Sequence, residues 1–193
     1  MIVRIFVVLF LLSAGCDFAR ANLVTNGGFE TGDFTGWTIS GNGISIDNAF
    51  VNSGCCDASF AAASTDPDPG ILSQGITTVP GIDYVLSFAL MDESGLFVNQ
   101  FIVTFGSVFG PGGLVFTGDQ VPFAYSTVTL KVPGADITST STILSFQGLN
   151  DLIAWNLDDV SLEAFAIPEP SSALLLSCAV ALFLGVASRR RAR

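Results

Sequence analysis

Histidine is absent from this chain of 193 residues. Its absence excludes the Ser-His-Asp and Cys-His arrangements of nucleophilic catalysis and every metal site with an imidazole ligand. The remaining plausible chemistry is glycoside hydrolysis by a pair of carboxylates, which must lie about 5 to 9.5 Å apart. The neighbouring acids Asp92-Glu93 and Asp158-Asp159 would point to opposite faces of a strand and make poor partners. The sequence therefore predicts a protein that is not an enzyme.

Positive charge is scarce in the central part of the chain. Residues 22–166 contain 15 acidic residues and one basic residue, Lys131, which gives a net charge of −14. All six arginines lie near the two chain ends. Because a nucleic-acid-binding surface needs a cationic footprint, this composition excludes one. It suits a protein that stays soluble outside the cell or that binds divalent cations.

Cysteine is also rare, with four residues in the chain. Cys16 and Cys178 lie in the apolar end segments, so the central region keeps only the adjacent pair Cys55 and Cys56. An oxidising export route permits a disulfide, although neighbouring cysteines can join only in a strained ring. A vicinal disulfide, an intermolecular bridge and two free thiols all remain open.

The central region lacks helical periodicity and is rich in β-strand signals. Turn sequences recur, such as Pro80-Gly81, Pro111-Gly112-Gly113 and Pro133-Gly134. Between the turns, apolar residues alternate with polar ones. Residues 22–166 are therefore expected to form one all-β domain, a β-sandwich of eight or nine strands, with jelly-roll topology. The expected core-facing or strand-forming residues are Ile82, Tyr84, Leu86, Phe88, Leu90, Phe97, Phe101, Val103, Phe105, Val128, Leu130, Val132, Thr142–Phe146 and Trp155–Leu162.

The N-terminal residues have the order of an export signal. A short cationic start is followed by the apolar stretch Ile5–Leu12 and by Ala19-Arg20-Ala21, an A-x-A cleavage site. Residues 1–21 are therefore predicted to be a signal peptide. An alternative is that Ser13-Ala14-Gly15-Cys16, which resembles a lipoprotein box, is processed at Cys16 and leaves a lipid anchor.

The C-terminal residues combine a proline-containing segment that disfavours a helix, an apolar run and a cationic end. Pro168-Glu169-Pro170 precedes the apolar run Ala173–Ala187, and Arg189, Arg190 and Arg191 follow it. A helix of this length spans about 22 Å against a hydrocarbon core of about 30 Å, a short span that arginine snorkelling can assist. The positive-inside rule favours a transmembrane helix with a cytoplasmic end over a buried core helix.

This C-terminal arrangement, residues 167–193, resembles the PEP-CTERM sorting tail of proteins from exopolysaccharide-producing Gram-negative bacteria. The resemblance implies export across the inner membrane and transient anchoring there. It also implies a partner, a sorting protease or transpeptidase of the exosortase type. The final location would be the cell surface or the extracellular matrix.

The ends of the central domain resemble galactose-binding-like jelly rolls found among carbohydrate-binding modules. The opening segment Asn22–Trp37 carries the sequence NGGFETG, and the closing segment is Leu157–Leu162. Pro80–Phe88 resembles a central strand that PEP-CTERM proteins commonly carry. The resemblance implies one structural calcium ion that joins the first and last strands through Glu30 and either Asp158 or Asp159.

Strand alternation selects between the two aspartates. If Val160 and Leu162 face the core, Asp158 shares their side and Asp159 faces outward. An inward carboxylate is costly unless it is paired or binds a metal, and no basic residue is near in sequence. The expected calcium ligands are therefore Glu30 and Asp158, with main-chain carbonyls of residues 26–28.

A sugar site would need an aromatic ring to stack on, and Trp37 and Trp155 are the candidates, although large aromatics more often serve the core. Trp155 has the better case, because alternation would turn it away from Val160 and Leu162. Two functions stay open: a noncatalytic module that binds exopolysaccharide, and a structural matrix or biofilm protein without a ligand. An exposed aromatic among amides and carboxylates would favour the first, and a face of serine, threonine and aliphatic residues would favour the second.

Overall fold

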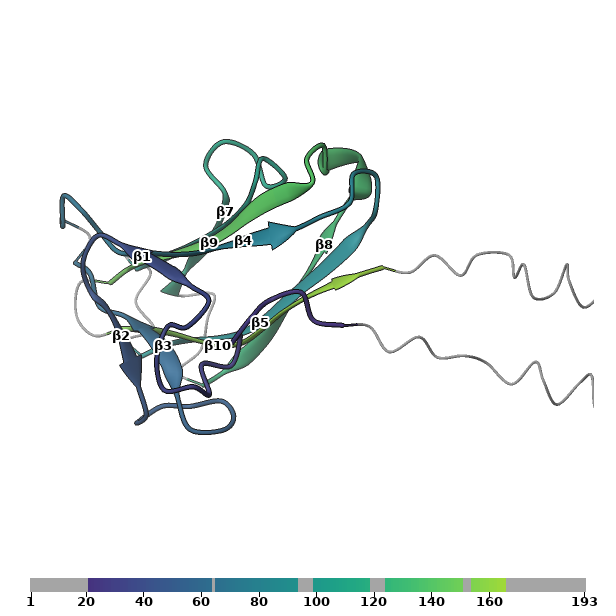
Figure 1. Cartoon of the computed structure of the whole chain (residues 1–193). Coiled ribbons are helices and arrows are strands. Elements are labelled where there is room, and N and C mark those ends of the chain that lie inside the picture. The colour runs from purple at the N-terminus through teal and green to yellow at the C-terminus, as the bar shows by residue number, and fades with distance from the viewer. Residues whose placement is uncertain (1–20, 64, 94–98, 119–123, 151–153, 166–193) are drawn as a thin grey trace, which may run out of the picture.

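The computed structural model describes residues 21–63, 65–93, 99–118, 124–150 and 154–165 (Figure 1). The predicted cleavage residue Ala19, the sorting residues 168–170 and the arginines at 189–191 lie outside these ranges, so their roles stay predictions. Within the described ranges, no helix is long and apolar enough to cross a membrane, and the predicted span lies beyond them.

Two five-stranded antiparallel sheets face each other as two layers (Figure 1). The first sheet has the strand order β1-β4-β9-β6-β7, and the second has the order β2-β3-β10-β5-β8. This arrangement confirms the predicted all-β sandwich, with ten strands in the described ranges in place of eight or nine. The strands are β1 (Thr38–Ser40), β2 (Ile44–Asp47), β3 (Asp57–Phe60), β4 (Ile71–Thr77), β5 (Tyr84–Asp92), β6 (Gln100–Phe105), β7 (Leu114–Thr117), β8 (Ser126–Val132), β9 (Ser141–Leu149) and β10 (Trp155–Ala164), and a 3-10 turn, η2 (Gly134–Asp136), lies between β8 and β9.

The core lies between the layers and is built from the alternating residues that the sequence indicated. Phe146 on β9 sits near its centre, with ring centroids 5.5 Å from Phe88, 6.0 Å from Phe101 and 6.0 Å from Trp37. Rings at such separations add edge and offset contacts to the gain from apolar burial. The largest fully buried side chains are Trp155, Phe29, Phe60, Phe88, Phe101, Phe105, Phe146, Leu72, Ile76, Leu86, Leu90 and Leu144.

Strand β10 contains an extra residue that changes which side chains face the core. Asp158 pairs with Ala89 and Ser161 pairs with Ser87, so β10 advances three residues while β5 advances two. Asp159, at φ +50°, occupies the left-handed conformation that such a bulge uses. The bulge resets the alternation, so Trp155 before it and Val160 after it both face the core. The prediction that Trp155 turns away from Val160 is therefore wrong.

The opening segment of the domain runs beside the end of β10. The Leu23 amide donates to the Leu162 carbonyl at 2.8 Å, and the Val160 amide donates to the Gly27 carbonyl at 2.9 Å. A Cβ at Gly27 would overlap the Val160 carbonyl, so only glycine fits this approach. The opening residues form turns rather than a first strand, yet they contact the last strand as expected.

Phe146→Ala is expected to lower the free energy of unfolding by about 3 to 5 kcal/mol, because it leaves a cavity among aromatic rings. Ile143 lies on the same strand but points outward and is 54% exposed. Ile143→Ala is the matched control and should cost less than about 1 kcal/mol. Urea denaturation measures both values, and equal costs would contradict this description of the core.

Candidate functional site

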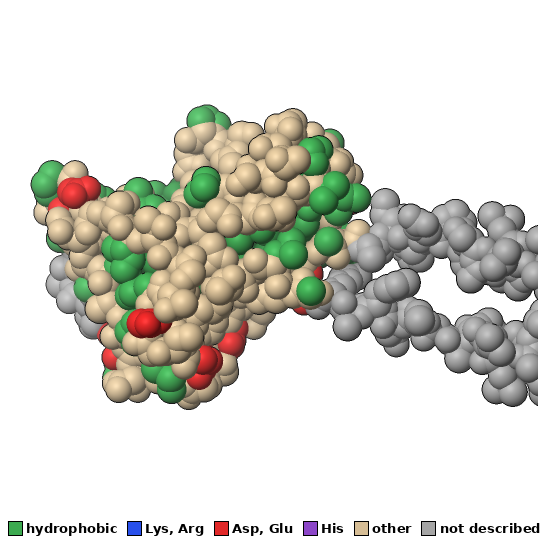
Figure 2. Space-filling model, in the orientation of Figure 1, with side chains coloured by type: hydrophobic (Ala, Val, Ile, Leu, Met, Phe, Trp, Pro, Cys, Tyr) green, Lys and Arg blue, Asp and Glu red, His purple; other side chains and the backbone are tan. Residues whose placement is uncertain are grey.

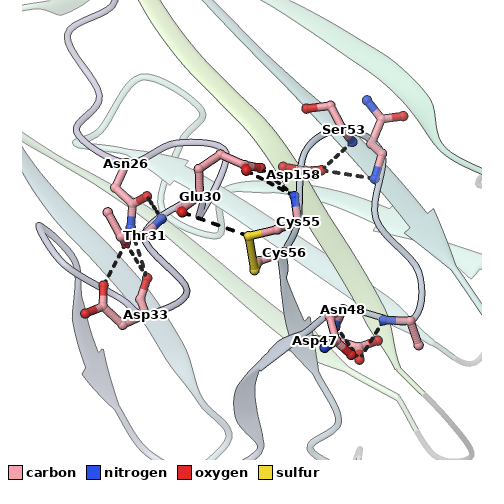
Figure 3. Close-up of a disulfide and its surroundings, with 12 residues drawn as sticks. Asn26, Glu30, Thr31, Asp33, Asp47, Asn48, Ser53, Cys55, Cys56 and Asp158 are labelled. Atoms are coloured by element: carbon pink, nitrogen blue, oxygen red, sulfur yellow. Dashed lines mark hydrogen bonds between the residues drawn. A yellow bond between two sulfur atoms is a disulfide. The ribbon is translucent and has the colours of Figure 1, made fainter.

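A loop after β2 folds over the bulged part of β10 and is held there by carboxylates (Figure 3). Asp158 accepts the amide hydrogens of Asn52 and Ser53, both at 3.0 Å. Asp159 accepts from the Asn52 side-chain amide at 2.6 Å and from the Ser53 hydroxyl at 2.7 Å. These charge-assisted bonds are stronger than neutral ones and tie the loop to the last strand.

Glu30 holds the same loop from the opening segment. Its carboxylate accepts the Cys55 amide hydrogen at 3.0 and 3.2 Å (Figure 3). A Cβ placed on Gly28 would lie 3.6 Å from Asp159 Oδ1, 3.7 Å from Asp158 Oδ1 and 3.7 Å from Glu30 Cγ. Three acidic side chains thus converge on one glycine, and we call Glu30, Asp158 and Asp159 the acidic junction. The sequence-predicted pair, Glu30 and Asp158, lies within it.

Of the cysteine alternatives, the structure has the vicinal disulfide between Cys55 and Cys56. Cys55 is exposed beside Glu30, whereas Cys56 is buried against the core immediately before β3. The disulfide therefore fixes the short connection between the loop and the sheet.

Asp158 does not share the side of Val160 and Leu162, contrary to the prediction. Asp158 directly follows the core-facing Leu157 on β10 and therefore lies on the outer side of the sheet. It is buried beneath the loop rather than within the sandwich. It faces outward because it alternates with Leu157, and the bulge that follows lets Val160 face inward. Asp159 is exposed, as predicted.

The acidic junction has the right chemistry for calcium, which prefers carboxylate and carbonyl oxygens. Its carboxylates, however, are turned toward loop amides. In the described part of the chain, no three acidic or thiol side chains are placed as a metal-binding group. Calcium at Glu30 and Asp158 therefore stays a prediction.

Beside the acidic junction lies a buried acid that the sequence analysis missed. Asp57 on β3 is fully buried, and the Tyr125 hydroxyl donates to its Oδ2 at 2.5 Å. Burial raises the pKa of Asp57 to about 7; the Tyr125 hydrogen bond opposes this, and repulsion from Asp47, Asp158 and Glu93 adds to it. Burial also raises the pKa of Asp158. Burial and then the contact with Asp57 raise the pKa of Tyr125, so its hydroxyl remains a donor at neutral pH.

Both tryptophans, the candidate sugar platforms, serve the core. Trp155 has no exposed surface and donates its indole N–H to the Leu149 carbonyl at 3.1 Å. Trp37 is 8% exposed, stacks on Phe29 at 5.9 Å and donates to the Asn26 carbonyl at 3.0 Å. Neither ring is free to stack on a ligand in this arrangement.

The outer side of the first sheet has a different character, and we call it the hydroxyl face. Strand register places Thr38, Ser73, Ser145 and Thr104 in one row across four strands. The hydroxyls of Thr104 and Ser145 share a hydrogen bond of 2.6 Å. Among the described residues of β1, β4, β9, β6 and β7, none is charged, and no aromatic residue faces outward. The other outward residues are Ser40, Ile71, Gly75, Thr77, Gln100, Ile102, Val115, Thr117, Ser141, Ile143, Gln147 and Leu149.

Acidic side chains concentrate elsewhere on the domain. In the view of Figure 2 most of them lie low, over the layer that contains β2 and β3, while the upper layer is mainly neutral. On this side the domain separates an acidic region from a mainly neutral one.

The contribution of Asp57 to stability is expected to fall as the pH rises. Its folded pKa of about 7 exceeds the ordinary value of 3.8, so the stabilisation is complete below about pH 4 and is lost as the pH passes 7. Each pKa unit corresponds to about 1.4 kcal/mol. In the presence of a chelator, the free energy of unfolding of Asp57→Asn should rise relative to that of the unsubstituted chain as the pH increases from about 5 to 8. The control Asp47→Asn should show no such relative rise. Parallel curves of unfolding free energy against pH for all three proteins would refute the predicted role of Asp57.

Comparison with known proteins identifies the fold. The sequence matches no protein-family model and no curated protein. The solved structure of the carbohydrate-binding module TmCBM61 in complex with β-1,4-galactotriose has a TM-score of 0.53 and 18% identity, covering 75% of this chain and 99% of that chain. The CBM22-1 xylan-binding domain from Paenibacillus barcinonensis Xyn10C has a TM-score of 0.51 and 16% identity, over 76% and 96% of the two chains.

A further similar structure is the enzymatically active domain of tailspike protein 4 from bacteriophage CBA120. It has a TM-score of 0.56 and 16% identity, but the match covers 75% of this chain and only 21% of that chain. At such identities the similarities establish a fold. This chain has the β-sandwich jelly-roll fold of carbohydrate-binding modules.

Proposed function

We propose that this chain is an exported, noncatalytic module that binds a neutral polysaccharide through the hydroxyl face. The observation that carries the proposal is the uncharged face on a domain whose residues 22–166 have a net charge of −14. The jelly-roll fold adds support, because similar structures include a module in complex with a galactotriose and a xylan-binding domain.

The residues of the hydroxyl face suit a sugar polymer. Its serine, threonine and glutamine side chains can donate and accept hydrogen bonds, and Ile102 and Ile143 supply apolar contacts. Strands about 4.8 Å apart repeat these groups across the sheet. Because no aromatic residue faces outward on the described strands of this sheet, affinity must come from many weak contacts, which favours a long chain over a single sugar. The surrounding carboxylates repel anionic polymers and so favour a neutral one.

A purely structural role in a matrix is the second candidate. It is favoured by the burial of Trp37 and Trp155 and by a face dominated by serine, threonine and aliphatic residues. Under either role, the features of residues 1–21 and 167–193 would deliver the domain to the cell surface or extracellular matrix through an exosortase-type sorting enzyme.

The glycan proposal predicts that one bulky charge on the hydroxyl face blocks binding. Ser145→Arg should weaken binding of the purified full-length chain to exopolysaccharide from the source cells by about tenfold or more, which is about 1.4 kcal/mol. Thr129→Arg places the same side chain on the outer side of the second sheet and should bind normally. Polysaccharide pull-down and calorimetry measure the effect, with melting curves as a folding control. No binding by the unsubstituted chain would leave the structural role as the better account.

The calcium expected at Glu30 and Asp158 belongs to the same proposal as a structural ion. At about pH 5.5, where Asp57 holds its proton, chelation should lower the melting temperature by several degrees. Glu30→Gln should remove that sensitivity, because it removes one carboxylate ligand. An unchanged melting temperature after chelation would argue against this ion.

A further inference from the structure

The outer side of the second sheet contains a second group of buried polar residues. Leu157 pairs with Ala58, and both face the core, so alternation places Asp57 and Ser59 on β3 and Asn156 on β10 on the opposite side. Asp57 and Asn156 have no exposed surface. Two polar residues on adjacent strands are thus shielded from solvent outside the apolar core.

Each of these two side chains uses one polar atom in a hydrogen bond and leaves its other polar atom without a hydrogen-bond partner. Asp57 Oδ2 accepts from Tyr125, and Asn156 Nδ2 donates to Glu93 at 2.8 Å. Asp57 Oδ1 and Asn156 Oδ1 are buried and have no hydrogen-bond partner. Asn156 pairs with Ser59, two residues from Asp57 on β3, so the two side chains are diagonal neighbours on one side of the sheet. Buried oxygens of this kind are almost always satisfied, so this pair calls for an occupant.

The charges around these oxygens are all acidic. Asp47 pairs with Asp57 across β2 and β3, and Asp158 and Glu93 also repel the Asp57 carboxylate. The neutral Tyr125 hydroxyl approaches from the segment before β8. In the described part of the chain the one basic residue is Lys131, which is exposed. It pairs with Val85 on β5, whereas Asp158 pairs with Ala89, four residues further along that strand. No side-chain cation therefore compensates Asp57.

We propose that Asp57 Oδ1 and Asn156 Oδ1 are ligands of a hard divalent cation, at a position separate from Glu30. Carboxylate and amide oxygens are the ligands that calcium and magnesium prefer, with water completing the shell. Since only the ionised carboxylate binds a metal, protons compete with the cation for Asp57. The position lies beside the acidic junction but has different side-chain ligands, one on β3 and one on β10.

Calorimetric titration of the full-length Glu30→Gln variant with calcium, and separately with magnesium, tests this inference. Glu30→Gln weakens the predicted ion at the acidic junction and leaves Asp57 and Asn156 in place. We expect this variant to bind one ion near pH 8. Absence of binding near pH 8 would overturn the proposal.

Second substitutions in the Glu30→Gln chain identify the ligands. Asp57→Asn should weaken ion binding near pH 8 at least tenfold, while Asp47→Asn, the neighbouring acid on β2, should retain it. Asn156→Ala is a second route to the same loss if Asp57→Asn does not fold, as melting curves would reveal. Retained binding in folded Asp57→Asn or Asn156→Ala would overturn the proposal. These results do not depend on polysaccharide binding, so the two proposals fail separately.

Discussion

The extra residue at Asp159 connects the core of this domain to its acidic junction. It lets Trp155 and Val160 both face the core although alternation alone would separate them. Asp158, which alternates outward after Leu157, meets the loop amides just before this extra residue. The Val160 amide, just after the bulge, donates to Gly27 and fixes the opening segment. The position of Glu30 therefore depends on the same local distortion of β10.

The loop contacts explain how so many carboxylates lie close together without basic partners. Asp158, Asp159 and Glu30 accept hydrogen bonds from backbone amides and polar side chains of the loop, which replace water and spread the negative charge. Asp57 is the exception, since its single hydroxyl partner leaves one oxygen unsatisfied. The strongly acidic composition is thus accommodated by backbone donors at one place and by a raised pKa at another.

Much of the architecture followed from the sequence, because turn residues and alternation report local geometry. The residues Tyr84, Leu86, Phe88 and Leu90 were placed correctly on the core side of β5. The bulge could not be foreseen, since Asp159 adopts its conformation only in the context of neighbouring strands, and the error about Trp155 follows from it. Asp57 was missed for a related reason: its burial depends on contacts far along the chain, such as Tyr125, rather than on its own segment.

The two ends of the described domain leave it at the same side (Figure 1). Strand β10, which leads to the C-terminal segment, lies in the interior of its sheet between β3 and β5, and the opening segment is bonded to it as well. Tension applied along β10 through that segment would load the hydrogen bonds on both of its edges together, in shear, instead of peeling an edge strand bond by bond. Under forced extension, the rate of unfolding sets the lifetime of a domain. A domain pulled along such a strand is therefore expected to unfold slowly under load.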